Sequence, residues 1–257
     1  MEVNTMRYTV LSYVFGGYDI VHEVVERDPN ADYIMVTDDR DLRSNTWRIV
    51  YDPMPDISVM EKCYFVRFNP FRYAANTELC IRLDASIAIL RPLGVFADKM
   101  QDGDYDRCLM IHPWRNTMPP EYAKWVQRRR YSQKQADCCM ALMRHMGYNM
   151  NYRGLYQGCF EILRNNRVNA DINAMTFALL RRSSLDGTID RIDQTMSSFV
   201  MNHLYSDRLR VLPVSQQIVI GGSYMQWCHH NSQQPKSWSI GLEPYLFNKP
   251  VKVWTPE

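Results

Sequence analysis

The sequence predicts one α/β domain across residues 1–257. Short apolar runs alternate with polar, turn-rich stretches in the first half of the chain, and apolar residues recur at helical spacing in the middle. A length of 257 residues with 46% hydrophobic and 23% charged residues is sufficient for one large core. The chain contains no internal repeat and no stretch whose composition indicates a linker between domains.

Five strands are expected in the first half of the chain. Each is a short apolar run that ends in polar or turn-forming residues, which is typical of buried strands in an α/β sheet. The fourth run is expected to bend at Asp84, and the fifth is followed directly by His112. The expected strands span residues 8–15, 32–37, 46–51, 80–90 and 107–111.

Helices dominate the middle of the chain. Ser132 and Gln135 form a capping-box pattern, and a methionine-rich apolar stripe then follows at helical spacing until Gly147, where we expect the helix to end. Asp193 lies where the N-cap of a later helix is expected. The other expected elements are strands at 155–163 and 210–214, helices at 170–182 and 195–205, and a polar loop at 226–239.

The composition bounds the partners and the compartment. A formal net charge of +2 gives no bulk field that would require nucleic acid or a membrane as partner. No apolar run approaches the roughly 18 residues that a membrane-spanning helix needs. The run at 8–15 follows Arg7 but lacks a small-residue cleavage site, so we expect a strand there and not a signal peptide. Seven cysteines without a Cys-x-x-Cys pair indicate reduced thiols, and we expect a cytoplasmic protein.

Asp84 is the most informative polar residue of the sequence. It lies within residues 81–90, a run that is otherwise almost wholly strand-forming. A carboxylate in that setting needs a partner to offset its desolvation, and a divalent cation or a ligand is the kind of partner that an active site supplies. The alternative is an aspartate that is hydrogen-bonded at a strand bend.

Polar residues also follow the ends of other expected strands. Ligands in open α/β sheets bind outside the carboxyl ends of the strands, so we expect these residues to converge at one edge of the sheet. Gly16 and Gly17 allow a ligand to approach the backbone closely, or they form only a tight turn. Asp38 and Asp39 either accept hydrogen bonds from a nucleobase or a ribose, or cap a turn through Arg43.

A series of short motifs occurs in order along the chain. The motifs are Phe15-Gly16-Gly17-Tyr18-Asp19, Thr37-Asp38-Asp39, Trp47, Leu83-Asp84, His112-Pro113-Trp114-Arg115, Gly154-Leu155-Tyr156, Ile162-Leu163-Arg164 and Asp193-Gln194-Thr195. In this order they resemble the DUF616 family of glycosyltransferase-like proteins, and the likeness spans residues 8–205. The resemblance implies a GT-A-like single domain with a mostly parallel central sheet flanked by helices.

The resemblance also implies an activity. A sugar would be transferred from a nucleotide diphosphate sugar to a glycan or another hydroxyl acceptor, and a divalent cation, Mn²⁺ or Mg²⁺, would bridge the two phosphates. The residues implied for binding the nucleoside are Phe15, Gly16, Gly17, Tyr18, Asp38 and Asp39.

Asp84 stands where the resemblance implies the metal-binding Asp-x-Asp of a GT-A enzyme. The second acid is missing, because Ser86 occupies its position. Either Ser86 or water would then complete the coordination of the cation. His229, in the expected polar loop, is implied as a late histidine ligand.

Cationic and acid–base residues complete the implied site. Arg67 and Arg115 would balance the charge of the diphosphate, and His112 would contact the acceptor or a metal. Asp193 is the candidate base for the acceptor hydroxyl, although an aspartate before Gln-Thr also fits a helix N-cap. Glu161 is a second candidate for the same role.

The run Arg128-Arg129-Arg130, with Lys124 and Lys134 nearby, is open to two interpretations. Such a run can meet an anionic acceptor or a lipid surface. It is also typical of a solvated helix end.

Two other functions would use the same residues. A metal-dependent nucleotidyltransferase or phosphodiesterase would employ the same carboxylates on a nucleotide substrate. A non-catalytic glycan-binding protein on a degenerate transferase fold is favoured by the serine at position 86, where the second acid is expected. The identity of the released product separates the two enzymes, since sugar transfer releases a nucleoside diphosphate and nucleotidyl transfer releases pyrophosphate.

Overall fold

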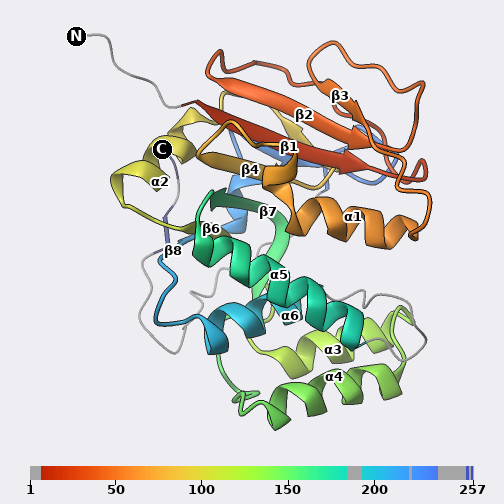
Figure 1. Ribbon diagram of the computed structural model, residues 1–257, viewed down its shortest axis with the longest axis vertical. Coiled ribbons are helices and arrows are strands. Elements are labelled where there is room, and N and C mark those ends of the chain that lie inside the picture. Colours follow the sequence, from red (N-terminus) through yellow and green to blue (C-terminus); the bar gives the residue numbers. More distant parts are fainter. Residues whose placement is uncertain (1–6, 184–192, 220–221, 237–252, 255, 257) are drawn as a thin grey trace.

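The computed structural model describes residues 7–183, 193–219, 222–236, 253–254 and 256. Its centre is a seven-stranded sheet with the order β3-β2-β1-β4-β7-β6-β8 (Figure 1). The strands are β1 (Tyr8–Val14), β2 (Ala31–Thr37), β3 (Arg48–Tyr51), β4 (Leu79–Leu83), β6 (Arg107–Ile111), β7 (Tyr156–Arg164) and β8 (Val211–Val214).

The central sheet is mostly parallel. Strand β1 runs parallel to β2 and β4, β2 runs parallel to β3, and β6 runs parallel to β8. Only β7 is antiparallel to its neighbours, which are β4 and β6. All seven residues of β1 are buried, as expected for a central strand that is covered on both faces. The prediction of an α/β fold with a mostly parallel central sheet is confirmed.

Helices flank the sheet. Figure 1 shows α3 and α4 farthest from the sheet, beyond α5 and α6, and shows α2 at the opposite end of the sheet from α3. The helices are α1 (Val59–Phe68), α2 (Gly94–Asp102), α3 (Met118–Gln127), α4 (Gln133–His145), α5 (Arg167–Arg182) and α6 (Asp193–Phe199), with short turns η1 (Pro70–Arg72), η2 (Val200–Leu204) and η3 (Gln216–Ile218).

The later helices begin at the capping signals in their sequences. Ser132 caps α4 and forms the predicted capping box with Gln135. Asn166 caps α5, because its side chain accepts a hydrogen bond from the backbone N–H of Asn169, and the helix therefore starts before the expected residue 170. The helix expected at 195–205 is α6 followed by η2, one turn of π-helix.

Three helices, α1, α2 and α3, are missing from the elements that the sequence predicts. Helix α1 buries Lys62 and Arg67 among its apolar residues, so the charged side chains interrupt the apolar stripe that marks a helix. Helix α3 contains Pro119 and Pro120, which suggest a loop but are tolerated in the first turn of a helix, where no intrahelical donor is needed.

The strand expected at 80–90 is two strands in two different sheets. Strand β4 ends at Leu83, and the chain turns through residues 84–86 before β5 (Ile87–Ile89). Strand β5 pairs with β9 (Met225–Trp227) in a separate two-stranded sheet. The expected polar loop therefore contains a short strand at its start, and its residues 237–239 lie outside the described part of the chain.

Apolar side chains fill both faces of the sheet. One cluster contains Phe96 and Phe160, whose ring centroids are 5.6 Å apart, a second contains Phe199 of α6, and a third contains Phe15. All seven cysteines are free thiols, as the sequence predicts. None of the helices in the described ranges is long and apolar enough to cross a membrane.

Candidate active site

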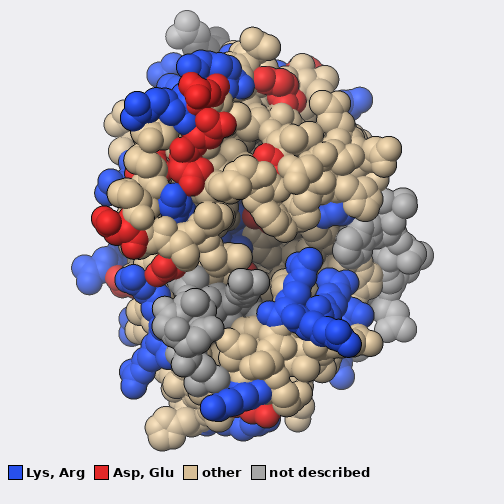
Figure 2. Space-filling view, turned by 90° about the vertical axis from the view of Figure 1, so that its right-hand side faces the viewer, with Lys and Arg blue, Asp and Glu red and all other residues tan. Residues whose placement is uncertain are grey.

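A cavity of about 520 Å³ lies at the carboxyl ends of β1 and β4. The chain runs outward from β1 to β2 and β3 and then returns to β4 on the other side of β1, so the strand order reverses between β1 and β4. Such a reversal is where open α/β sheets bind ligands. Phe15, Tyr64, Asp84, Trp125 and His230 are among the lining residues. Figure 2 shows a hollow near the centre of this face of the molecule.

Asp84 lies in the wall of this cavity, in the turn that links the two sheets. The turn is fixed by two backbone hydrogen bonds of 2.9 Å, from Asp84 N to the carbonyl of Cys159 and from Ile87 N to the carbonyl of Asp84. The Asp84 side chain is 39% exposed, and its only hydrogen-bond or ion-pair partner among the described residues is Arg82 Nη1 at 3.4 Å. Its carboxylate therefore has unused hydrogen-bonding capacity that faces the cavity.

The Asp84 turn rests on a buried cluster of opposite charges. Arg82 is fully buried, and its Nε donates to Glu161 Oε1 at 2.8 Å. Burial alone would raise the pKa of Glu161, but the charges of Arg82, Arg107 and Arg67 outweigh that effect and lower the pKa to about 2. Glu161 is buried and is not one of the residues that line the cavity. It is an ionised structural group beneath the site.

Arg67 connects this cluster to the cavity. It lies in the last turn of α1, lines the cavity and forms an ion pair with Asp193. Its Nε is buried and makes no hydrogen bond to any described residue. A Cβ added at Gly158 would collide with the Arg67 guanidinium, so the glycine of β7 provides the space that the arginine occupies.

Asp193 lies behind Arg67, as the first residue of α6. Burial raises the pKa of Asp193 above its ordinary value, despite the opposing charge of Arg67. Asp193 is not among the described residues that line the cavity. It can act on a bound ligand directly only if Arg67 moves, and otherwise it acts by positioning Arg67.

The glycine turn after β1 adopts the left-handed conformation that favours glycine. The φ angles of Gly16 and Gly17 are 61° and 63°. Asp38 holds this turn, because its carboxylate accepts from Gly16 N at 2.9 Å and pairs with Lys62 Nζ at 2.8 Å. Burial would raise the pKa of Asp38, but these two partners outweigh it and lower the pKa. Asp38 supports the turn and is absent from the cavity lining.

The remaining nucleoside candidates divide between the cavity and its surroundings. Phe15 and Tyr18 line the cavity. Asp39 lies in an exposed turn, where its carboxylate accepts from the backbone N–H of Asp41 at 2.8 Å. The expected contact with Arg43 is not made, since that guanidinium donates to backbone carbonyls of residues 40 and 42.

His112 and Arg115 belong to a second buried cluster, next to the cavity wall. They surround Glu121, which forms an ion pair with Arg115 and lies 3.5 Å from His112 Nε2. Burial and the charge of Arg115 lower the pKa of His112 to about 3, so its ring is neutral. Glu121 also accepts at 2.7 Å from the indole N–H of Trp125, which lines the cavity, and it accepts from Gln194, the neighbour of Asp193.

No signal in the sequence points to Glu121, because a lone glutamate outside any predicted helix is typical of a solvated side chain. It is 1% exposed and has four described partners, which makes it the centre of this second cluster. Two of these partners, His112 and Arg115, belong to the His112 motif.

The histidine that reaches the cavity is His230 and not His229. The ring of His230 lies 4.9 Å from that of Tyr18, and its Nδ1 is 2.6 Å from Asp19 Oδ2. His229 is exposed and is absent from the cavity lining. Ser86 is buried, lines the cavity, and its hydroxyl accepts from the indole N–H of Trp227 at 3.1 Å.

The donor set fits a cation only if a substrate shares in binding it. Among the residues described, no group of three or more His, Cys, Asp or Glu side chains is arranged to hold a metal ion. Asp84 is a single, partly exposed carboxylate in the cavity. Mg²⁺ is commonly held by one or two carboxylates together with phosphates of the substrate and water, and Asp84 fits that pattern.

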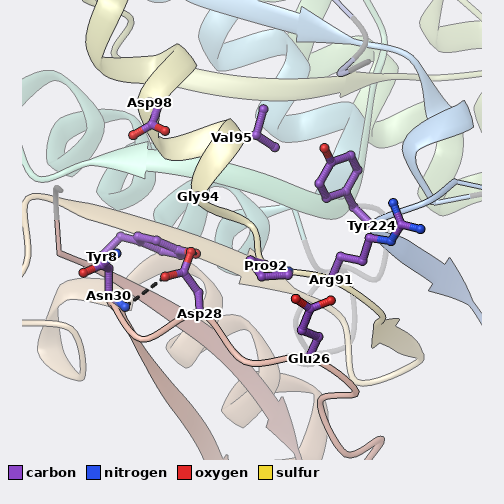
Figure 3. A pocket seen from close by; sticks show the side chains of 10 residues that line it. All are labelled: Tyr8, Glu26, Asp28, Asn30, Arg91, Pro92, Gly94, Val95, Asp98 and Tyr224. Carbon is purple, nitrogen blue, oxygen red and sulfur yellow. Dashed lines mark hydrogen bonds between the residues drawn. The ribbon is translucent and has the colours of Figure 1, made fainter. Parts of the chain in front are cut away.

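A second cavity, of about 610 Å³, lies at the opposite end of β1 (Figure 3). Its central acid, Asp28, accepts from the Tyr8 hydroxyl at 2.8 Å and from Asn30 N at 2.9 Å. A Cβ added at Gly94 would lie 2.8 Å from Asp28 Oδ2, so the start of α2 packs directly on this carboxylate. Asp28 thus joins β1 to α2, and each of its carboxylate oxygens accepts a hydrogen bond from the protein.

Known proteins give no independent guide to the site. A scan against protein-family models finds no family that matches the chain. A search of curated proteins also finds no match. The resemblance to the DUF616 family therefore rests on the ordered motifs alone, and the function has to be inferred from the cavity.

Proposed function

We propose that this protein transfers a sugar from a nucleotide diphosphate sugar to a glycan or another hydroxyl acceptor, on a GT-A-like fold. The observation that carries the proposal is Asp84, a partly exposed carboxylate in a cavity at the reversal point of the sheet. Arg67 lines the same cavity and supplies a cation there. This pairing suits a diphosphate that is bound with a divalent cation.

The nucleoside is assigned to the end of β1. Phe15 and Tyr18 line the cavity there and offer aromatic surface to a base. No Cβ at Gly17 would meet another atom within 4 Å, so the backbone at this turn is open to close approach by a ligand. Asp38 contributes by holding Gly16 in position.

The diphosphate is assigned to Asp84 and Arg67. Asp84 would hold Mn²⁺ or Mg²⁺ together with phosphate oxygens, and such a cation neutralises the charge that develops on a leaving diphosphate. Arg67 donates to phosphate oxygens from the α1 side of the cavity. The buried pair of Arg82 and Glu161 holds the Asp84 turn and Arg67 in place.

The acceptor base is assigned to Asp193, on condition that Arg67 moves away from it and opens the path to the cavity. A base that takes the proton of a hydroxyl group works best with a pKa above that of an ordinary aspartate, and burial raises the pKa of Asp193 in that direction. Glu161 is a poor base, because its pKa is about 2 and its carboxylate is bound to Arg82. Its role in the proposal is to position the two arginines.

A thermal-shift panel tests the proposal. We expect one nucleoside diphosphate to raise the Tm by roughly 5–10 °C at a hundredfold excess over its Kd, and to do so more strongly with Mn²⁺. Asp84→Asn should abolish the Mn²⁺-dependent part of the shift. The matched control is Asp98→Asn, in the cavity at the other end of β1, which should leave the shift unchanged.

The product separates transfer from its alternatives. Release of a nucleoside diphosphate from a hydrolysed or transferred nucleotide sugar supports the proposal, whereas release of pyrophosphate from a nucleoside triphosphate would indicate a nucleotidyltransferase. A panel in which no nucleotide shifts the Tm would contradict both enzymes and leave a glycan-binding protein without catalysis.

A further inference from the structure

The end of α3 has an unusual sequence for its backbone conformation. The N–H of Arg129 donates to the carbonyl of Val126 at 2.9 Å, and the N–H of Arg130 donates to the carbonyl of Trp125 at 3.1 Å. This pair of bonds is a Schellman motif, in which the residue at the position of Arg129 is usually glycine. Arg129 has a φ of 55°, in the left-handed region that disfavours a residue with a side chain. An arginine therefore occupies a position where glycine would relieve the backbone strain.

These arginines are exposed and have no acidic partners. Arg128, Arg129 and Arg130 are all exposed, and no carboxylate in the described ranges lies within salt-bridge distance of them. The cluster differs in this respect from Arg67, Arg82 and Arg115, each of which is paired with an acid. Figure 2 shows a group of lysine and arginine side chains beside the hollow. The positive charge at this rim is available to a ligand.

The basic group is joined to the cavity through an aromatic side chain. Arg130 and Trp125 both line the cavity, and the guanidinium of Arg130 lies over the Trp125 ring at 5.7 Å. The indole N–H of Trp125 is held by the buried Glu121, so the orientation of the ring is fixed by the second cluster. The result is an aromatic ring of fixed orientation with a cation over one of its faces.

A helix-end role explains only part of this arrangement. Cations near a helix C-terminus interact favourably with the helix dipole, and this accounts for one basic residue in the last turn. It does not account for an arginine at the strained position 129 or for the placement of Arg130 in a cavity wall. Strained residues that persist in this way cluster at ligand-binding sites.

We propose that the end of α3 is the acceptor subsite and that the acceptor is an anionic glycan, one whose sugars bear carboxylate or phosphate groups. Trp125 would stack on a sugar ring through the face that Arg130 does not cover, and Arg130 and Arg129 would pair with the anionic groups of the sugar. The assignment of this glycan as the acceptor rests on the proposed function, whereas the binding of an anionic glycan at this site does not. Phe15 and Tyr18, assigned to the nucleoside, approach the cavity from β1, so the two ligands have separate walls.

Calorimetry with defined oligosaccharides tests the subsite. The probes are a galacturonic acid trisaccharide, a phosphorylated trisaccharide and a neutral galactose trisaccharide, each titrated into the full chain without nucleotide. We expect at least one anionic probe to bind at least tenfold more tightly than the neutral one, with an affinity that falls as salt is raised. Arg130→Gln should remove that preference. The control Arg144→Gln, at an exposed position in the last turn of α4, should leave it intact.

Arg129→Gly separates binding from folding. Relief of the left-handed strain should raise the Tm by up to roughly 2–4 °C, while the affinity for the anionic probe falls severalfold. A variant that is more stable and yet binds more weakly cannot owe its loss of binding to misfolding. Equal binding of anionic and neutral probes, or unchanged affinity in both Arg129→Gly and Arg130→Gln, would overturn the proposal.

Three further outcomes identify which proposal has failed. Loss of the nucleoside diphosphate shift in Arg130→Gln, with glycan binding unchanged, would assign Arg130 to the donor and overturn the acceptor subsite. Cosedimentation with phosphatidylserine vesicles that depends on Arg130, without any preference among the oligosaccharides, would make the rim a membrane surface and also overturn it. Selective glycan binding in a protein that no nucleotide stabilises would support the subsite and contradict the transferase.

Discussion

Strand β1 has a cavity at each end, and the two cavities differ in how their acids are held. At the amino end, Asp28 accepts hydrogen bonds from Tyr8 and Asn30 and lies against the start of α2. At the carboxyl end, Asp84 contacts Arg82 at 3.4 Å and keeps 39% of its side chain exposed. The amino-end cavity is the larger, at about 610 Å³ against about 520 Å³. Volume therefore does not identify the site, whereas its position at the carboxyl ends of the strands, where the strand order reverses, does.

The difference extends to what lies beneath each acid. Asp28 is itself part of the packing between β1 and α2, so its burial serves the fold. Beneath Asp84 lies a layer of buried charge, in which Arg82 and Glu161 form an ion pair with each other. A ligand at the carboxyl end can therefore use Asp84 without disturbing the groups that hold it. Each of the following changes tests this division.

The largest effect is expected from Glu161→Gln. The substitution keeps the shape of the side chain but removes the charge that Arg82, Arg107 and Arg67 surround, and an unbalanced buried charge costs about 3–5 kcal/mol. The free energy of unfolding, measured by urea denaturation, should fall by that amount. Asp84→Asn, one layer above, should cost less than about 1 kcal/mol. Equal losses of stability in the two variants would show that Asp84 also serves the fold.

A pH dependence is expected from the second buried cluster at the same edge. The pKa of His112 is about 3 in the folded protein, below its ordinary value of 6.5, because of burial and Arg115. Between these two values the unfolded chain binds a proton that the folded protein does not, so stability is lost as the pH falls. The loss should be about 1–2 kcal/mol between pH 6.5 and pH 5.

The control for this pH dependence is an exposed histidine. His112→Gln should remove this part of the pH dependence from urea denaturation curves, whereas His145→Gln, at an exposed position near the end of α4, should leave it in place. A wild-type stability that is flat across this range would mean that His112 is not held neutral. The carboxyl edge would then lack the fixed electrostatics that distinguish it from the amino edge.

The sequence predicted the parts of the site that depend on local signals. A glycine pair after an apolar run marks the turn at Gly16 and Gly17, and an acid within a strand-forming run marks Asp84, because both signals lie within a few residues. The mostly parallel sheet was likewise expected. The point at which chain order reverses became known only from the pairing of β1 with β4.

The rest of the site depends on contacts between distant residues. Glu161 lies 79 residues from Arg82 in sequence, and only their contact shows that Glu161 is a counter-ion and not a free acid. His229 and His230 are neighbours, and His230 faces the cavity because Asp19, 211 residues away, holds its ring. No periodicity within the polar segment distinguishes the two. Partner choice over such separations is a property of the packed fold.

The smallest effect, and the most direct test of the two ends of β1, is the pair Tyr8→Phe and Tyr13→Phe. Burial and the adjacent Asp28 raise the pKa of Tyr8, so its hydroxyl stays protonated and donates to Asp28. Its removal leaves a buried carboxylate one donor short and should cost about 1–2 kcal/mol. The Tyr13 hydroxyl accepts only a weak hydrogen bond, from Arg82 Nη1 at 3.5 Å, and its loss should cost less than about 0.5 kcal/mol.

The two tyrosine variants should also differ in ligand binding. Tyr8→Phe should leave the Tm shift by a nucleoside diphosphate unchanged, because the amino-end cavity is a structural feature. Tyr13 lies in the wall of the candidate site, so any change in the Tm shift should be confined to Tyr13→Phe. A nucleotide shift that is lost in Tyr8→Phe and kept in Tyr13→Phe would reverse the assignment, since it would place the ligand among Asp28, Arg91 and Asp98 at the other end of the strand.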